Sequence, residues 1–127
     1  MSHFTAIKTK LADRRYLLEA LRDLGHTCEE GNVAVRGYAG IRTPVEIVIP
    51  TRQRDYDIGF RKVGDAYECV ADWDQLKGVR QADFLAKVAQ RYAYHAAKAK
   101  LAEQGFVLAS EETQKDGRIH LVLRRTT

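Results

Sequence analysis

The chain has 127 residues, of which 45% are hydrophobic and 30% are charged, and 21 basic residues against 17 acidic ones give a formal net charge of +4. This length and composition are typical of one globular domain, which we expect over residues 1–127. A membrane-spanning protein is excluded, because no apolar run approaches the ~20 residues of a membrane span. A dedicated nucleic-acid binder is not favoured, because the basic residues alternate with acids along most of the chain instead of clustering on one face.

The N-terminus lacks an apolar segment behind a basic one, so we expect no secretory signal. The two cysteines, Cys28 and Cys69, are far apart and form no CxxC pair. This spacing favours a reducing compartment over a disulfide. We therefore expect a cytoplasmic protein.

The first elements predicted are a strand and a helix. Residues 3–10 alternate between two faces in the manner of a β-strand. Asp13 is a suitable N-cap for a helix, and Gly25 supplies the left-handed residue that commonly ends one. Between them, leucines recur at helical spacing: Leu17, Leu18, Leu21 and Leu24.

Five short strands are expected next, and their short connections favour antiparallel neighbours. The dipeptide Gly31-Asn32 is interpreted as a turn between the first two strands. The third strand is the clearest, because it is rich in β-branched residues and Pro50 closes it. The expected strands are 26–29, 33–38, 45–49, 57–63 and 67–71.

The last third of the chain predicts a long helix and a hairpin. The helix begins near Gln81, keeps a helical period of apolar residues to about Gln104 and ends at Gly105. Segments 106–110 and 118–124 then form a hairpin across a Lys-Asp-Gly loop.

These elements predict an α+β fold with a single antiparallel sheet and two helices on one face. A pattern also occurs twice: a short apolar segment, a helix that ends at glycine, and a strand that ends in arginine. The repetition suggests two βαββ-like halves, as in a ferredoxin-like fold, although common helix-stop chemistry explains it as well as duplication does.

Two acid pairs flank aromatic residues, in Asp55-Tyr56-Asp57 and in Asp72-Trp73-Asp74. Paired carboxylates serve general acid–base catalysis or bind Mg²⁺. They also lie where loops begin, and aspartate is a common turn residue. We therefore favour a role in turns.

The histidines and cysteines show no metal-binding spacing. His26 and Cys28 are two residues apart on a possible strand, but zinc needs three or four ligands. The remaining candidates are scattered along the chain: His3, Cys69, His95 and His120. We expect neither a metal nor another cofactor.

The long helix carries two features that could serve binding. Tyr92 and Tyr94 cannot face the same way, because a helix turns ~100° per residue, so Tyr94 or His95 would point outward unless the helix buries both tyrosines. Basic residues also share part of one face, where they could follow phosphates or be a solvated surface, which we favour: Lys87, Arg91, Lys98 and Lys100.

Several segments together resemble a known family. The opening MSHF with Ile7–Lys10, the Leu24-Gly25 pair, Tyr56–Phe60, Tyr67–Asp72, Gln90–His95 and Gln104–Phe106 are similar to the hypothetical chloroplast reading frame thirty-five family of plastids and cyanobacteria, which also occurs in other bacteria. That family is a domain of unknown function, so the resemblance supplies no catalytic residues. It implies a small cytosolic or stromal protein that acts with partners.

Because no catalytic motif appears, the leading hypothesis is a non-catalytic domain that binds another protein or a second copy of itself, with no membrane contact. One alternative is an RNA-binding or ribonucleoprotein-associated module that uses the basic helix face. A second alternative is a metal-dependent enzyme built on Asp55, Asp57 and the histidines. The expected partner-binding residues are Tyr56, Asp57, Trp73, Arg91, Tyr94 and His95.

Overall fold

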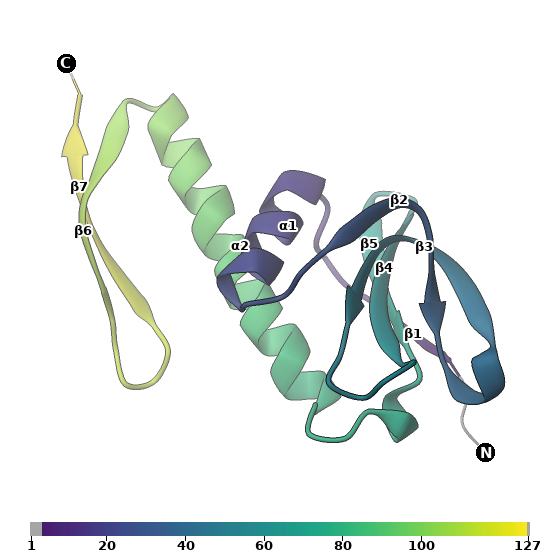
Figure 1. Ribbon diagram of the computed structural model, residues 1–127. Helices are drawn as coiled ribbons and strands as arrows, with labels where there is room; N and C mark the ends of the chain where they lie inside the picture. The colour runs from purple at the N-terminus through teal and green to yellow at the C-terminus, as the bar shows by residue number, and fades with distance from the viewer. Residues whose placement is uncertain (1–3, 127) are drawn as a thin grey trace. The chain divides into compact units, whose positions relative to one another are not determined.

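The computed structural model describes residues 4–126. The chain divides into two compact units, of which unit 1 ends at Tyr92 and unit 2 begins at Ala93. The long helix α2 (Gln81–Glu103) crosses this boundary and contributes to both units (Figure 1). The expectation of one domain over the whole chain stays a prediction.

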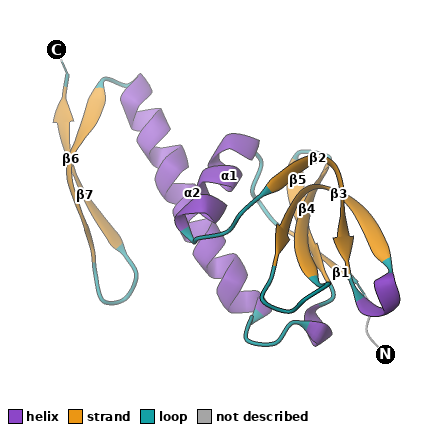
Figure 2. Ribbon diagram, viewed as in Figure 1, coloured by secondary structure: helices purple, strands orange, loops and turns teal. Residues whose placement is uncertain are grey.

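Unit 1 is built on a five-stranded antiparallel sheet with the strand order β1-β5-β4-β3-β2. Two short 3₁₀ turns interrupt its connections, η1 (Tyr38–Gly40) after β2 and η2 (Trp73–Gln75) after β5 (Figure 2). The strands are β1 (Thr5–Lys8), β2 (Glu29–Arg36), β3 (Arg42–Pro50), β4 (Asp57–Val63) and β5 (Ala66–Ala71).

Helix α1 (Arg14–Asp23) has the ends that the sequence predicts. The Asp13 side chain accepts a hydrogen bond from the backbone N–H of Arg15 at 2.8 Å, which satisfies one of the free donors of the first turn. Gly25 follows the helix with φ +86°, a left-handed conformation that costs glycine little.

The main core lies between the helices and one face of the sheet. Leucines of α1 pack there against isoleucines of β3 and β4, and Phe84 and Val88 from the first half of α2 complete the layer. The α+β fold and the placement of both helices on one face are therefore confirmed. The fully buried members of this core include Leu17, Leu21, Ile47, Ile49, Ile58, Phe60 and Cys69.

The opposite face of the sheet carries a second, smaller core because the sheet is strongly curled (Figure 1). The end of β2 arches over this face, so Val35 of β2 lies directly on Gly59 of β4. Beyond β2, Gly37 packs against the ring of Phe4, where a Cβ atom would stand 2.6 Å from Cζ. The face without helices is therefore closed by one of the sheet's own strands.

A β-bulge in β2 replaces the turn that the sequence predicts at Gly31-Asn32, so that prediction was wrong. Glu30 pairs with Ile47 and Val33 pairs with Val45, which leaves two residues of β2 opposite one residue of β3. Gly31 has φ +108° and begins the bulge. The strand expected at 26–29 is therefore not formed apart from Glu29, and β2 runs without interruption from Glu29 to Arg36, which covers most of the strand expected at 33–38.

The strands are distributed over two sheets instead of the single sheet expected. Strands β6 (Phe106–Thr113) and β7 (Ile119–Arg125) form their own two-stranded antiparallel sheet in unit 2. The two halves of the chain therefore differ in how their strands pair. A ferredoxin-like arrangement, which would place both halves in one sheet, is not formed.

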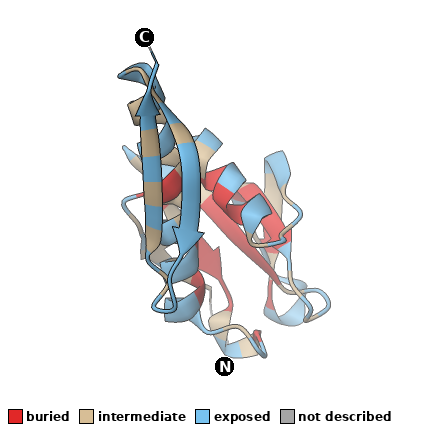
Figure 3. Ribbon diagram, turned by 90° about the vertical axis from the view of Figure 1, so that its left-hand side faces the viewer, coloured by how far each residue is buried: buried red, intermediate tan, exposed pale blue. Residues whose placement is uncertain are grey.

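Unit 2 consists of the second half of α2 and the β6–β7 hairpin. Tyr94 is its one buried hydrophobic residue among residues 93–126, with 8% of its surface exposed. The apolar residues of the hairpin are half-buried or exposed (Figure 3). Five of them, Phe106, Val107, Leu108, Leu121 and Leu123, line an apolar hollow of about 350 Å³ together with Tyr94 and Leu101 of α2.

In residues 4–126, neither helix combines the length and the apolar character that a membrane crossing requires.

Candidate functional site

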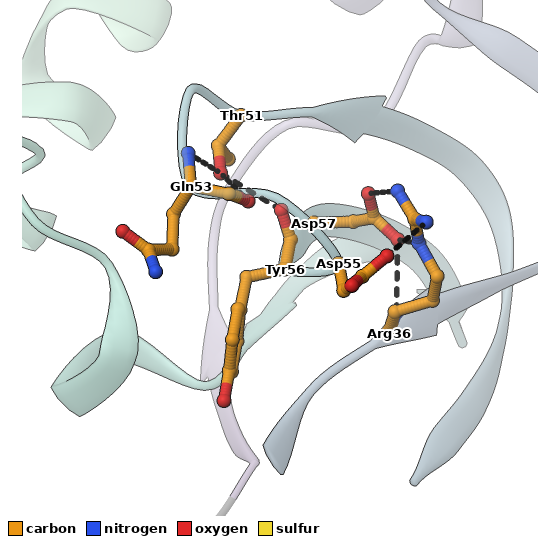
Figure 4. Close-up of polar contacts among 6 residues, drawn as sticks. All are labelled: Arg36, Thr51, Gln53, Asp55, Tyr56 and Asp57. Atoms are coloured by element: carbon orange, nitrogen blue, oxygen red, sulfur yellow. Dashed lines mark hydrogen bonds and ion pairs between the residues drawn. The ribbon is translucent and has the colours of Figure 1, made fainter. Parts of the chain in front are cut away.

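A bidentate ion pair joins β2 to β4 across the helix-free face of the sheet (Figure 4). Arg36 Nε donates to Asp57 Oδ2 at 2.8 Å, and Arg36 Nη2 donates to Asp57 Oδ1 at 2.9 Å. The backbone N–H of Arg36 adds a third hydrogen bond to Asp57 Oδ2, also at 2.9 Å. These contacts raise the pKa of Arg36, chiefly through the hydrogen bonds from its side chain to Asp57. Fork geometry of this kind holds both partners in a fixed orientation.

The loop before β4 presents a second carboxylate to the same arginine. Asp55 Oδ1 accepts from Arg36 Nη1 at 3.2 Å, and Asp55 has φ +68°, a left-handed conformation that is uncommon outside glycine. Thr51 organises this loop, since its hydroxyl donates to the backbone carbonyl of Tyr56 at 2.8 Å (Figure 4). The backbone N–H of Gln53 in turn donates to the Thr51 hydroxyl oxygen at 3.2 Å. The acids that the sequence places in turns therefore do lie in and beside a turn.

Next to this ion pair lies a groove of about 850 Å³, which we call the β2–β3 groove. Its lining is about half polar and half apolar, and it includes four charged residues: Glu29, Arg36, Arg42 and Asp57. Glu29 begins the strand, whereas Arg36 ends it beside Arg42 of β3. Within residues 4–126, neither Glu29 nor Arg42 has an ion-pair partner. The apolar and uncharged lining consists of Asn32, Val33, Ala34, Pro44, Val45, Val48 and Pro50.

A third aspartate secures the segment that follows β2. Asp72 is 2% exposed, and its Oδ2 atom accepts from the backbone N–H of Tyr38 at 3.1 Å. Its Oδ1 atom and the indole Nε1 atom of the adjacent Trp73 are buried without a hydrogen-bond partner in the described chain. The Tyr38 contact and the Arg36 ion pair together hold the end of β2 over the sheet.

The aromatic residues that the sequence predicts to bind a partner are half-buried or buried in the structure. Tyr56 and Trp73 are half-buried and pack against the main core, where the rings of Trp73 and Phe84 lie 6.0 Å apart. Tyr94 is buried in unit 2, with its ring 5.0 Å from that of His95. These side chains therefore contribute to packing, because burial of a large ring is favourable wherever a core surface is within reach.

On helix α2, Tyr92 accepts hydrogen bonds from the backbone, and two of the basic residues form ion pairs. The Tyr92 hydroxyl accepts hydrogen bonds from the backbone N–H groups of Ala12 and Asp13, at 3.1 and 2.8 Å. Arg91 forms an ion pair with Asp23 at 2.9 Å. In addition, Lys87 forms an ion pair with Asp83, with 3.4 Å between the charged atoms. Two members of the expected basic stripe are thus already neutralised by acids.

The metal candidates of unit 1 are a histidine and two cysteines that burial affects. His26 is half-buried at 5.6 Å from the Phe84 ring, and burial lowers its pKa. Burial raises the pKa of both the Cys28 and the Cys69 thiol, most strongly for the fully buried Cys69. In the described ranges, three or more potential ligands do not gather at any point. His3, which the sequence analysis names as a possible metal ligand, lies outside the described residues.

Of the predicted site residues, the structure places Asp57 in the candidate site, and sequence reasoning missed Arg36. The sequence did contain an indication, because Arg36 directly follows an apolar run. A charged residue at the end of a strand that packs on a core commonly pairs with an acid. What the sequence could not supply was the curl of the sheet, which brings Arg36 and Asp57 together across a strand that lies between them.

Comparison with known proteins agrees with the resemblance seen in the sequence. Residues 20–122 match a family model described as "Protein of unknown function (DUF1257)". Proteins titled "Uncharacterized protein ycf35" are similar over 98% of this chain and 98% of their own length, with 39% identity in Guillardia theta and 33% in Cyanophora paradoxa. A further relative with the same title, from Pyropia yezoensis, is 34% identical over the same shares.

No solved structure gives a significant match. The family model covers most of the chain, and the relatives align along nearly all of it, so the resemblance to the hypothetical chloroplast reading frame thirty-five family is confirmed. The chain belongs to the DUF1257 family, whose function is unknown.

Proposed function

We propose that this chain is an accessory protein-binding domain that holds an extended segment of another protein in the β2–β3 groove. The observation that supports the proposal is the groove itself, which combines apolar residues with an acid, Glu29, and a base, Arg42, that have no ion-pair partner in residues 4–126. Recognition sites commonly combine apolar lining with a few polar groups that fix the orientation of the ligand.

The spacing of the charges favours an extended peptide as the occupant. Glu29 and Arg36 stand at the two ends of β2, and Arg36 pairs with Arg42. Because β2 curls over the sheet, Glu29 lies close enough to Arg36 to contribute to the raised pKa of the arginine, so a short linear segment can contact the charges at both ends of the strand. The complementary segment carries a basic side chain for Glu29, small apolar residues for the apolar part of the lining and an acidic side chain for Arg42.

The ion pair beside the groove supports binding over catalysis. A general base must be able to take up a proton, and a Mg²⁺ ligand must offer unengaged oxygen atoms. Both carboxylate oxygens of Asp57 and one of Asp55 are engaged by the Arg36 guanidinium. A cation at this point would also be repelled by the arginine. The metal-dependent alternative therefore receives no support from these acids.

The RNA-binding alternative depends on a basic helix face. Arg91 and Lys87 are paired with Asp23 and Asp83, so part of the charge that would attract phosphates is offset. Counterion release scales with the number of phosphates that a protein neutralises, and two paired residues reduce that number. Protein binding is the proposal that the contacts favour.

Site-specific crosslinking tests the proposal in native extract. A photo-crosslinking residue at Ala34 lies in the groove, and the same residue at Arg22 on α1 is the matched control on the other side of the sheet. We expect a crosslink from Ala34 alone, to a linear segment that carries one acid and one base. Crosslinks from Arg22 alone, or crosslinks to RNA, would overturn the proposal.

A synthetic peptide of the crosslinked segment then tests the charge pattern. Arg42→Glu should weaken its binding at least tenfold, and reversal of the peptide's acid to a base should restore it. Lys10→Glu is the control, because Lys10 is exposed and lies outside the groove lining. Equal affinity of the wild-type and Arg42→Glu proteins would show that the groove does not hold the segment.

A further inference from the structure

The β6–β7 hairpin of unit 2 has an outer face with apolar residues at its centre. Residues that pair directly across the two strands share a face, so Val107 with Arg124, Ser110 with Val122, and Glu112 with His120 lie on one side. Val122 is 49% exposed and Val107 is 37% exposed. Val107 also borders the hollow beside α2 that the leucines of the alternate positions line, whereas Val122 lies outside that lining and is the more exposed of the two.

Charge on this face is separated along the length of the hairpin. Arg124 lies near the end where the hairpin leaves Gly105, and Glu112 lies toward the turn. Neither residue forms an ion pair with another side chain in residues 4–126. The face therefore has a basic end, an apolar centre and an acidic end.

The outer edges of the hairpin are not paired with any other strand of the described chain. In residues 4–126, β6 and β7 pair only with each other. A two-stranded sheet is marginally stable by itself, and its open edges are templates for further pairing. Additional burial on this hairpin would therefore stabilise it.

We infer that the outer face of the β6–β7 hairpin is a self-association surface whose occupant is the same face of a second copy of this chain. A two-fold axis turns the second hairpin end for end, so the basic end of each copy lies over the acidic end of the other. Arg124 of one copy then approaches Glu112 of its partner, and the Val122 side chains of the two copies meet near the axis. This inference concerns unit 2 and is independent of the groove in unit 1.

The oligomeric state of the full chain tests the inference. Sedimentation or light scattering should give a mass of about twice 14.4 kDa at high protein concentration. Val122→Glu should give a monomer, because the substitution places two like charges at the axis. High salt should weaken the dimer, since the end-to-end attraction is between exposed charges.

Charge-reversal variants distinguish a loss of the predicted ion pair from a loss of folding, because only an ion pair is restored when both charges are reversed together. Glu112→Arg and Arg124→Glu should each lower the dimer affinity at least tenfold, and the double variant should restore it. Arg42→Glu in the groove should leave the dimer unchanged, which separates this inference from the proposed function. A monomeric wild-type chain at the highest attainable concentration, or a double variant that stays as weak as the single variants, would overturn the inference.

Discussion

Val35 of β2 rests on Gly59 of β4 so closely that a methyl group on Gly59 would overlap the Cγ2 atom of Val35. The same methyl group would stand 3.0 Å from both Cγ atoms of Val45. Glycine at this position therefore permits the end of β2 to arch over the sheet and to form the second core. It also makes the small residue in β4 a requirement of the groove.

Gly59→Ala should lower the free energy of unfolding by about 2 kcal/mol, because an extra methyl group in a tightly packed core forces its neighbours to move. Urea denaturation measures this change. Val35→Ala in the same background removes the overlapping methyl groups and should recover part of the loss. If Gly59→Ala were as stable as the wild type, the close contact between the two strands would be contradicted.

Removal of Arg36 should be costly because it leaves the buried Asp57 carboxylate without its partner. We expect Arg36→Met to lower the free energy of unfolding by about 2–3 kcal/mol. The loss should be smaller than that for a fully buried ion pair, because the Arg36 side chain is partly exposed. The double variant Arg36→Met with Asp57→Leu should lose less than Arg36→Met alone. A double-mutant cycle in urea measures the coupling, and additive losses would contradict it.

Stability should fall as the pH falls through the range in which His26 titrates. Burial lowers the pKa of His26 in the folded protein, so the unfolded chain binds a proton first. The contribution is fully present above the unfolded pKa of 6.5, and it is lost as the pH falls from there toward the lower folded value. Urea midpoints between about pH 7.5 and pH 5.5 measure it.

The control for that experiment is His26→Gln, which cannot titrate in this range. Its midpoint should change less with pH than that of the wild type. Equal pH dependence of the two proteins would show that His26 does not carry the effect.

The two cysteines should differ in reactivity toward iodoacetamide. Only a thiolate is nucleophilic, and burial raises the pKa of both thiols, most strongly for the fully buried Cys69. Cys28 is half-buried and should react slowly in the native protein, whereas Cys69 should react only after unfolding. Mass spectrometry follows the labelling. Rapid native labelling of a Cys28→Ser variant would contradict the burial of Cys69.

Local features of the fold could be predicted because local chemistry determines them. Asp13 caps α1 and Gly25 ends it as expected, since a side-chain acceptor and a left-handed glycine act on their immediate neighbours. The period of α2 and the β6–β7 hairpin were likewise predicted to within a few residues. In each case the deciding interaction joins residues close together in the chain.

Features that depend on distant contacts could not be predicted. The dipeptide Gly31-Asn32 looks like a turn, but pairing with β3 on both sides of it converts it into a bulge. The aromatic rings of Trp73 and Tyr94 look suited to an interface, but each finds a packing partner within its own unit. Arg36 and Asp57 are 21 positions apart, and only the curl of the sheet reveals that they form a pair.

The bulge at Gly31 and Asn32 also constrains how this chain can change in length. Side chains alternate strictly along a strand, so one residue gained or lost there would turn Val33 and Val35 to the opposite side of β2. Arg36 would then face away from its carboxylate, and the groove would lose its lining in a single step. Insertions and deletions should therefore be rejected at this point, whereas the exposed turn around Lys115 can lengthen or shorten freely.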